Sequence, residues 1–543
     1  MMLAPLAIAA GLDVGRVVDN GQIHENRALV DATGIGWVRI NLRLDAKNAI
    51  EDEFAIYDMV IDDYLSRGIE VYILINDEAV GPSANAHGSD AWIENDFVPA
   101  AVKIVDHFKN RVRVYEVINE PNDYAGGSSA RFAPRQFAKI LQDTYLAVKH
   151  DAGHLSDGCW QVSLVSGPLF SFDDDPADTY LGEVYSIGKS QLAWDYTHQV
   201  TGSYPLDGIG YHMYVAQGLD SSNADVRTQM LANLSAMDAV ASTYESAPKQ
   251  FWVSEYGWEA SVVGNDVQAQ RLTAGFNAMK ESGKVATAFY FNFQDFPGAT
   301  YGIYDDQLDV RPAAAALSQI APLPLRASIE HVEVPADVAP QTDAVIMVTL
   351  RNRGTETWSP QDAYRLAAGG GCPDSSAANE LAWTPAPGDG YANSLTDARV
   401  YVPHEVLPGD TVEIHVRVHA PDNEGTYTFA ARMVHEGVTM FGPTIRATVT
   451  VTNAPVGGDD SPPVTDPPSS SGCGCASTAC DHRSNVLLLL VVAALLGRRR
   501  RGTSTAASRV RRYCNVDSPN RHDRTRCLRA RLRRLDRQHD HHL

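Results

Sequence analysis

The chain has 543 residues, of which 44% are hydrophobic and 21% charged, a composition that suits a soluble globular protein of two or more domains. Its formal net charge is −22, and because residues 498–543 hold 15 Arg against 4 Asp, the rest of the chain carries −33. Such an acidic body argues against nucleic acid as a partner, since phosphate binding needs clustered Lys and Arg.

The first ten residues are apolar but lack the basic residues that open a signal peptide. They have two interpretations, a truncated signal or the beginning of a first strand over Ala7–Val14. We favour the strand, because the strand count of the following region requires it.

Apolar runs typical of buried strands alternate with amphipathic, helix-like segments from the start of the chain to residue 322. The predicted strands are Ala7–Val14, Gly36–Leu42, Ile69–Ile75, Val112–Ile118, Gln161–Val165, Gly208–Met213, Phe251–Glu255 and Thr287–Asn292. Eight strands with intervening helices predict an α/β fold, a (β/α)8 TIM barrel over residues 1–322. A doubly wound sheet is the alternative, but the first strand lacks the Gly-rich phosphate turn of that fold.

Two of these strands, the fourth and the seventh, end in a glutamate, Glu120 and Glu255. A carboxylate is costly to bury without a partner or a task. Because catalytic groups of such barrels lie at the C-terminal ends of strands, the fold would bring the two together. Paired carboxylates carry out glycoside hydrolysis, in the retaining form with one as acid/base and one as nucleophile. A salt bridge is the structural alternative for either glutamate.

Two motifs at these strand ends resemble a known clan of enzymes. Asn-Glu-Pro at 119–121 and Ser-Glu-Tyr-Gly at 254–257 are similar to signatures of the retaining (β/α)8 glycoside hydrolases that include family 5 and family 39 enzymes. The resemblance covers roughly residues 7–320. It implies that Glu120 is the general acid/base, that Glu255 is the nucleophile and that Asn119 binds the sugar 2-hydroxyl.

The same resemblance extends to three further side chains. Arg39, at the end of the second strand, matches an arginine that steadies the nucleophile, with a salt bridge to Glu116 as the alternative. Glu116 itself is predicted to be a buried structural partner. His212 and Tyr214 resemble a His-x-Tyr element, which implies that His212 lines the −1 subsite and that Tyr214 hydrogen-bonds the nucleophile.

The end of the eighth strand departs from the clan, because residues 289–295 contain no Trp to stack on the −1 sugar. Trp258 and Phe293 are the candidates for this platform, and Trp258 is placed among the substrate-binding residues. We expect no metal and no organic cofactor. The reaction implied by the resemblance needs neither, and none of the seven Cys forms a CxxC pair.

Residues 326–453 have a different pattern, short alternating strands separated by Pro, Gly, Asp and Asn, which predicts an antiparallel β-sandwich. Residues 352–358 and 408–411 resemble the four-tryptophan module named after the autophagy receptor next to BRCA1. This copy has Trp358 and Trp383 but no Trp within 430–433. We therefore predict only a spacer or binding module.

The remaining residues form a tripartite tail. Residues 454–485 are a Pro/Ser/Gly/Cys linker, and 486–501 combine an apolar run with four Arg, which is typical of a membrane stop although shorter than a spanning helix. A buried core helix is the alternative for this run. With Gly-Cys-Gly-Cys at 472–475, it resembles the C-terminal sorting tails of myxobacterial exported proteins. Residues 502–543 are basic and predicted to be disordered, or are translated past a true stop.

The sequence thus predicts an exported, monomeric retaining glycoside hydrolase attached to the cell surface or outer membrane, with a carbohydrate substrate. Two alternatives remain open, a non-catalytic glycan-binding surface protein and a transglycosylase with the same site. The sugar, its linkage and endo or exo action depend on the βα loops and are not predicted.

Overall fold

The computed structural model describes most of the chain from Ile8 to Asn453. The residues outside this description are 1–7, 16, 20–21, 24–25, 46, 124–130, 152–161, 172–176, 369–380, 384–397 and 454–543. The predicted linker, apolar segment and basic tail therefore lie outside the described residues, as do all seven Cys. Within the described part, no helix has the length and apolarity that a membrane crossing requires.

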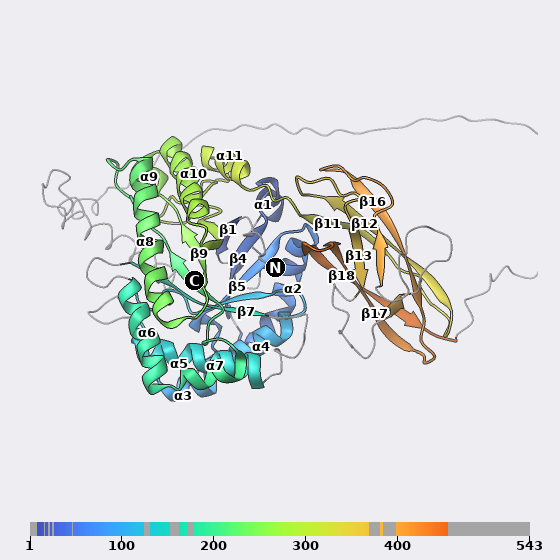
Figure 1. Cartoon of the computed structure of the whole chain (residues 1–543), viewed down its shortest axis with the longest axis horizontal. Helices are drawn as coiled ribbons and strands as arrows, with labels where there is room; N and C mark the ends of the chain where they lie inside the picture. Colours follow the sequence, from blue (N-terminus) through green and yellow to red (C-terminus); the bar gives the residue numbers. More distant parts are fainter. Residues whose placement is uncertain are drawn as a thin grey trace, which may run out of the picture. The chain divides into compact units, whose positions relative to one another are not determined.

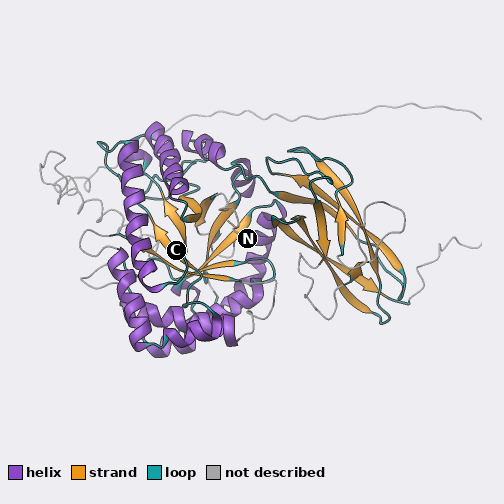
Figure 2. Ribbon diagram, in the orientation of Figure 1, coloured by secondary structure: helices purple, strands orange, loops and turns teal. Residues whose placement is uncertain are grey.

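Eight parallel strands close into a barrel, each hydrogen-bonded to two neighbours (Figures 1 and 2). Around the barrel they are β1 (Ala9–Gly15), β4 (Trp37–Leu42), β5 (Glu70–Ile75), β6 (Val114–Val117), β7 (Ser163–Phe170), β8 (Gly208–His212), β9 (Gln250–Tyr256) and β10 (Val285–Phe291). A small hairpin of β2 (Val18–Asp19) and β3 (Gln22–Ile23) follows β1. The predicted TIM barrel is confirmed, and each predicted strand corresponds to one barrel strand.

Helices lie outside the strands (Figure 2). The α-helices are α1 (Arg27–Ala32), α2 (Phe54–Ser66), α3 (Asp90–Trp92), α4 (Val98–Phe108), α5 (Pro134–Tyr145), α6 (Ala177–Gln191), α7 (Trp194–Thr201), α8 (Asn223–Tyr244), α9 (Ala260–Val263), α10 (Asn265–Ser282) and α11 (Pro312–Ile320). Short 3₁₀ or π turns complete them, η1 (Ile50–Glu53), η2 (Asp77–Ala79), η3 (Ile93–Phe97) and η4 (Leu146–Asp151). The long helices bury their apolar faces on the barrel, as their amphipathic sequences predict.

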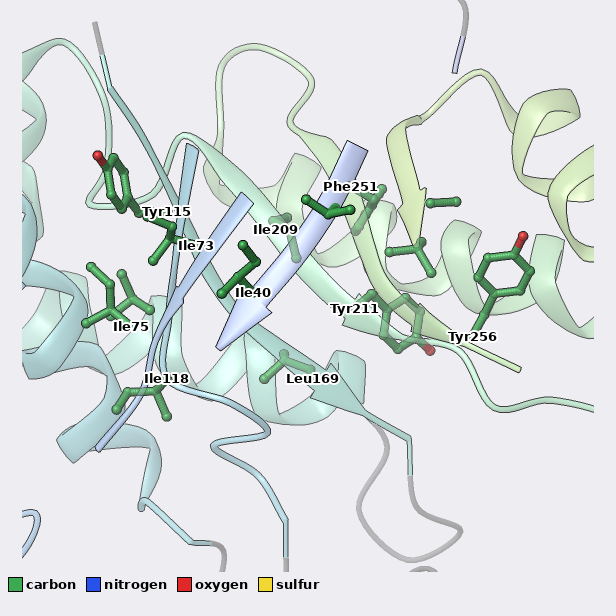
Figure 3. Packing of buried hydrophobic residues seen from close by; sticks show 14 of the residues in the cluster. Ile40, Ile73, Ile75, Tyr115, Ile118, Leu169, Ile209, Tyr211, Phe251 and Tyr256 are labelled. Carbon is green, nitrogen blue, oxygen red and sulfur yellow. The ribbon is translucent and has the colours of Figure 1, made fainter. Parts of the chain in front are cut away.

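Side chains cover both faces of the barrel strands, which is why their sequences are continuous apolar runs. Outward-facing residues such as Ile40, Ile73 and Phe251 form the cluster between strands and helices (Figure 3). A smaller cluster, Tyr72, Val114, Val165 and Phe289 with Trp37 and Trp252, is formed by the inward-facing residues. The inner cluster fills the barrel below the C-terminal strand ends, where the polar residues begin.

The β-rich module that follows is a sandwich of two antiparallel four-stranded sheets with a hydrophobic cluster of its own. One sheet consists of β11 (Ala327–Glu333), β12 (Asp343–Asn352), β16 (Thr411–His419) and β14 (Ala382–Trp383). The other consists of β15 (Arg399–Tyr401), β13 (Tyr364–Ala368), β17 (Gly425–His435) and β18 (Thr439–Val451). The predicted sandwich is confirmed.

Candidate active site

The chain leaves β6 through an unusual backbone that positions Glu120. Ile118 has φ 69° and Glu120 has φ 43°, both in the left-handed region that side chains disfavour, β-branched ones most. Ile118 packs among the outward-facing residues (Figure 3), and so does the preceding residue, Val117. In a regular strand, one of the two would face the barrel interior. The turn at Ile118 is accommodated by Gly167 of β7, where a Cβ would lie 2.1 Å from the Ile118 carbonyl oxygen. Asn119 and Glu120 follow directly at the barrel mouth.

A β-bulge in β9 positions Glu255. Tyr211 of β8 pairs with Val253 and the next residue, His212, pairs with Glu255, so Ser254 is the extra residue. Trp252 belongs to the inner cluster and Val253 to the outer one, and strict alternation would turn Glu255 outward. The extra residue reverses the alternation, as bulges do beside many active sites. Glu255 therefore faces the barrel mouth.

Glu120 and Glu255 meet across His212. One carboxylate oxygen of each glutamate and one ring nitrogen of His212 all lie within 4.8 Å of one another. The His212 Nδ1 atom lies 2.7 Å from Glu120 Oε1, and Nε2 lies 3.4 Å from Glu255 Oε1. The His212 side chain is fully buried, whereas the two carboxyl groups keep a small exposure of 15% and 11%. The imidazole thus connects the two carboxyl groups and leaves both accessible from the mouth.

Arg39 lies beneath the pair and contacts three carboxylates. Its Nη1 atom lies 2.6 Å from Asp13 Oδ2 and 2.8 Å from Glu255 Oε1, and its Nη2 atom lies 2.7 Å from Glu116 Oε2. Nη2 also donates to Asn119 Oδ1 at 2.7 Å. Arg39 thus forms the salt bridge to Glu116 and also contacts the carboxylate of Glu255.

Both oxygens of Glu255 have a donor. Tyr214, just after β8, donates from its hydroxyl to Glu255 Oε2 at 2.6 Å, while Arg39 binds Oε1. Burial, followed by the nearby Glu255 charge, raises the Tyr214 pKa well above its usual value, so this hydroxyl stays protonated. The Tyr214 contact is the one that the sequence resemblance implied.

The surroundings of the two glutamates favour different protonation states. Burial, reinforced by Asp123, raises the pKa of Glu120 to about 8. Burial also raises the pKa of Glu255, but only to about 7, because the positive charge of Arg39 opposes the increase. Burial lowers the pKa of His212, which keeps the ring neutral at pH 7. The proton shared by the pair therefore resides preferentially on Glu120, and Glu255 is the better anion.

The expected role of Trp258 is wrong. Its side chain is completely buried, and its indole Nε1 donates to the Val215 carbonyl oxygen at 2.8 Å. The ring packs against α10, where a Cβ on Gly275 would lie 3.1 Å from it. Trp258 follows the nucleophile strand in sequence but belongs to the outer core, so it cannot offer a face to a sugar. Phe293, the other candidate, is only 5% exposed.

Another aromatic side chain, Phe291, occupies the mouth at the end of β10. It is partly exposed, and its ring lies 6.2 Å from that of Tyr214 and 5.5 Å from that of Tyr301, edge-on to both. Since Tyr214 contacts Glu255 directly, only the Tyr214 ring separates Phe291 from Glu255. Phe289 and Phe291 alternate with Tyr290, and this period of two could have identified Phe291 as the inward residue at the strand end.

Sequence reasoning missed two acidic or polar partners at the site. Asp13 lies within the first strand and binds Arg39, and its signal was a lone carboxylate inside an apolar strand. Asn76, after β5, accepts the Asn119 backbone N–H through Oδ1 at 3.0 Å. This contact connects residues distant in sequence, and no local pattern marks it.

Glu120, His212 and Glu255 also have the spacing of a possible metal site. Oxygen and imidazole donors would suit a divalent transition metal. Both Glu255 oxygens, however, are already bound, by Arg39 and by Tyr214, and the guanidinium supplies the positive charge that an ion would otherwise bring. The donor set therefore fits a proton-transfer site better than a metal centre.

One family model matches the part of the chain that forms the sandwich. Residues 333–451 match the family model described as the Ig-like domain from next to BRCA1 gene. No curated protein sequence matches the chain. The family match is thus confined to the sandwich and does not include the barrel.

Solved structures resemble the chain in fold at low sequence identity. A family 39 glycoside hydrolase from Bacteroides cellulosilyticus WH2 is 14% identical, with 76% of this chain and 81% of that chain covered and a TM-score of 0.39. A beta-glucosidase from Thermotoga maritima is 14% identical, with 59% and 98% covered and a TM-score of 0.42. GH5_18 from Streptomyces cattleya is 15% identical, with 58% and 80% covered and a TM-score of 0.41. We take the function from the geometry of the site itself.

Proposed function

We propose that the protein is a retaining glycoside hydrolase that cleaves O-glycosidic bonds of an oligo- or polysaccharide. The observation that carries this proposal is the approach of the two carboxyl groups, with oxygens of Glu120 and Glu255 within 4.8 Å. Retaining enzymes place these groups about 5–5.5 Å apart, whereas inverting enzymes need about 6.5–9.5 Å to admit a water. The separation of the two carboxyl groups is thus shorter than an inverting mechanism requires.

In the first step, Glu255 attacks the anomeric carbon as Glu120 protonates the departing oxygen. The bond from the anomeric carbon to the leaving oxygen breaks, and an ester bond to Glu255 forms. Arg39 and Tyr214 hold the attacking carboxylate in a single orientation. Glu120 has the proton to give because burial favours its neutral form.

In the second step, Glu120, now ionised, takes a proton from water. The resulting hydroxide equivalent attacks the anomeric carbon, and the ester to Glu255 breaks to release the sugar with its original configuration. His212 stays close to both carboxyl groups throughout, and its neutral ring can accept a hydrogen bond from protonated Glu120 through Nδ1. A transglycosylase would differ only in the acceptor, a sugar hydroxyl in place of water.

Three side chains are assigned to the substrate. Asn119, held by Arg39, would bind the sugar 2-hydroxyl, and His212 would line the −1 subsite. Phe291 replaces Trp258 as the platform, because it is partly exposed beside Tyr214. The chain is further proposed to act as an exported monomer, attached to the cell surface or outer membrane through residues 472–501.

Separate Glu120→Ala and Glu255→Ala variants test the reaction on a panel of aryl β-glycosides and polysaccharides. We expect Glu120→Ala to lose about 10²–10⁴-fold in turnover with poor leaving groups, the contribution typical of general acid catalysis. Glu255→Ala should show no measurable turnover. Glu245→Gln is the matched control, because this glutamate is 7% exposed and binds Tyr185 on the outer shell.

Azide then separates the two roles by the anomer that it produces. In Glu255→Ala, azide attacks the anomeric carbon directly and should give a glycosyl azide of inverted configuration. In Glu120→Ala, azide attacks the glycosyl-enzyme and should give the retained configuration. Wild-type turnover by both variants would exclude the proposed reaction, and glycan binding without turnover by the wild type would favour a binding protein.

A further inference from the structure

We propose that this active site selects neutral or amino sugars and rejects sugars that carry a carboxylate or sulfate. The inference rests on the proposed function and concerns the charges that face the reacting ring. It follows from three features of the barrel mouth: the groups around Arg39, the ion pairs at the rim and the aromatic wall beside Glu255.

The innermost charges are unbalanced in favour of carboxylates. The Arg39 guanidinium is shared by Asp13, Glu116 and Glu255, and Glu120 stands beside them. A single positive charge therefore faces three anions, and no N–H of this guanidinium is left for an acidic group on a substrate. The electrostatic potential at the position of the reacting sugar is therefore negative.

The charges of the guanidinium groups at the rim are compensated as well. Each of the described arginines in the loops after the barrel strands is paired with a carboxylate. The pairs are Arg43 with Glu78 at 3.0 Å, Arg131 with Asp77, and Arg311 with Asp295 at 2.5 Å. Arg131 also donates to the Asn119 carbonyl oxygen at 2.9 Å, so it lies directly above the acid/base loop. These arginines hold the loops together, and their charges are neutralised.

The wall of the mouth beside Glu255 is aromatic. Phe170 at the end of β7 lies 5.7 Å from Tyr214, which lies 6.2 Å from Phe291, and Phe291 lies 6.0 Å from Phe296. These four side chains are partly exposed and form a continuous row of rings. Such a surface suits the C–H face of a pyranose and offers no charge to a carboxylate.

The negative potential that disfavours acidic sugars also favours the proposed reaction. The transition state resembles an oxocarbenium ion, whose positive charge the carboxylates stabilise. A cation placed to accept a uronate would weaken that stabilisation. A carboxylate about 5 Å from this unbalanced charge, at the effective dielectric of a partly buried site, loses on the order of 100-fold in binding.

Matched substrates that differ only at C6 test the inference with the full chain. We compare kcat/KM for aryl β-glucoside with β-glucuronide, aryl β-galactoside with β-galacturonide, and neutral oligosaccharides with their C6-oxidised forms. We expect the neutral member to exceed the acidic member by at least about 100-fold. A kcat/KM for an acidic member within tenfold of that for its neutral counterpart would overturn the inference without contradicting the proposed hydrolase activity. Turnover of no substrate in either set would overturn the proposed function itself.

Variants identify the origin of the selectivity. Glu78→Gln removes the partner of Arg43 and should narrow the ratio of neutral to acidic turnover several-fold. Glu281→Gln, which removes the partner of Arg227 on the outer helices, is the matched control and should leave the ratio unchanged. The other Lys and Arg residues of these loops are Arg16, which lies outside the described residues, and the exposed Lys47. If Arg16→Ala/Lys47→Ala changes the ratio more than Glu78→Gln does, the paired charges are not its cause.

Discussion

Tyr214 and Arg39 hold Glu255 by its two oxygens, and this division determines what each contact contributes. Arg39 is buried and shared with two further carboxylates, so its removal would leave several buried charges without a partner. Tyr214 touches only the nucleophile among these acids. Its hydroxyl is therefore the contact that can be removed with the least disturbance.

We expect Tyr214→Phe to lower kcat/KM about 10–100-fold, since a hydrogen bond to a charged group contributes about 1.5–3 kcal/mol. Tyr211→Phe is the matched control, because that buried hydroxyl lies 2.7 Å from Ser171 Oγ and points away from the site. Steady-state kinetics with one aryl glycoside would compare them. Equal losses in the two variants would mean that Tyr214 acts through packing alone.

The pH dependence of kcat/KM follows from the different protonation of the two glutamates. The proposed mechanism requires ionised Glu255 and protonated Glu120, so kcat/KM should rise as Glu255 loses its proton and fall as Glu120 loses its own. The raised pKa values, about 7 and about 8, place this bell in the neutral to weakly alkaline range. The two limbs belong to the coupled pair rather than to either residue alone.

The falling limb can be assigned with Glu120→Ala and an aryl glycoside whose leaving group needs no acid. In this variant, the first step should keep the rising limb of Glu255 and lose the falling limb, as measured by the release of the phenol in the presteady state. A falling limb that persists unchanged would assign the acid role to another group. The rising limb should also shift to lower pH, because a neighbouring acid is gone.

At the scale of elements, the sequence predicts strands well and strand ends poorly. The runs ending in Glu120 and Glu255 are continuous and apolar, so the sequence predicts that they are buried and where they stand in the order of the barrel strands. The bulge at Ser254 and the left-handed Ile118 have no local signal, because both depend on the neighbouring strand. Trp258 was misplaced for a related reason, since a position just after a catalytic strand does not fix the side to which the residue turns.

Gly167→Ala tests whether the β6 end depends on its neighbour. A Cβ at 167 would lie 2.1 Å from the Ile118 carbonyl oxygen, so the β6 end must move or β7 must distort, at a cost of about 1–3 kcal/mol. We expect lower stability to denaturant and a loss of kcat, because Glu120 follows two residues later. Gly182→Ala in α6 is the control, since its Cβ would meet its nearest neighbour at 3.6 Å. A Gly167→Ala variant with normal activity would show that Glu120 is positioned by other contacts.

At the scale of the whole molecule, the barrel and the sandwich each have a hydrophobic cluster, and both clusters belong to the compact unit that ends at Ala454. All residues of the candidate site lie within the barrel, between Asp13 and Phe291. The segment with the predicted sorting signal, residues 472–501, lies outside the described residues. Chemistry and attachment are thus assigned to different parts of the chain.

A chain truncated after Ala454 should therefore separate these two properties. We expect the purified truncated protein to keep kcat/KM within about twofold and the same thermal unfolding transition, because the described partners of the site residues all precede Ala454 in the chain. In its native host, the truncated chain should be released into the medium, whereas the full chain stays with the cell surface or outer membrane. Activity assays, calorimetry and cell fractionation measure the three outcomes. Retention of the truncated chain at the cell surface would assign the attachment to the barrel or the sandwich, and loss of activity on truncation would assign a structural task to the residues beyond Ala454.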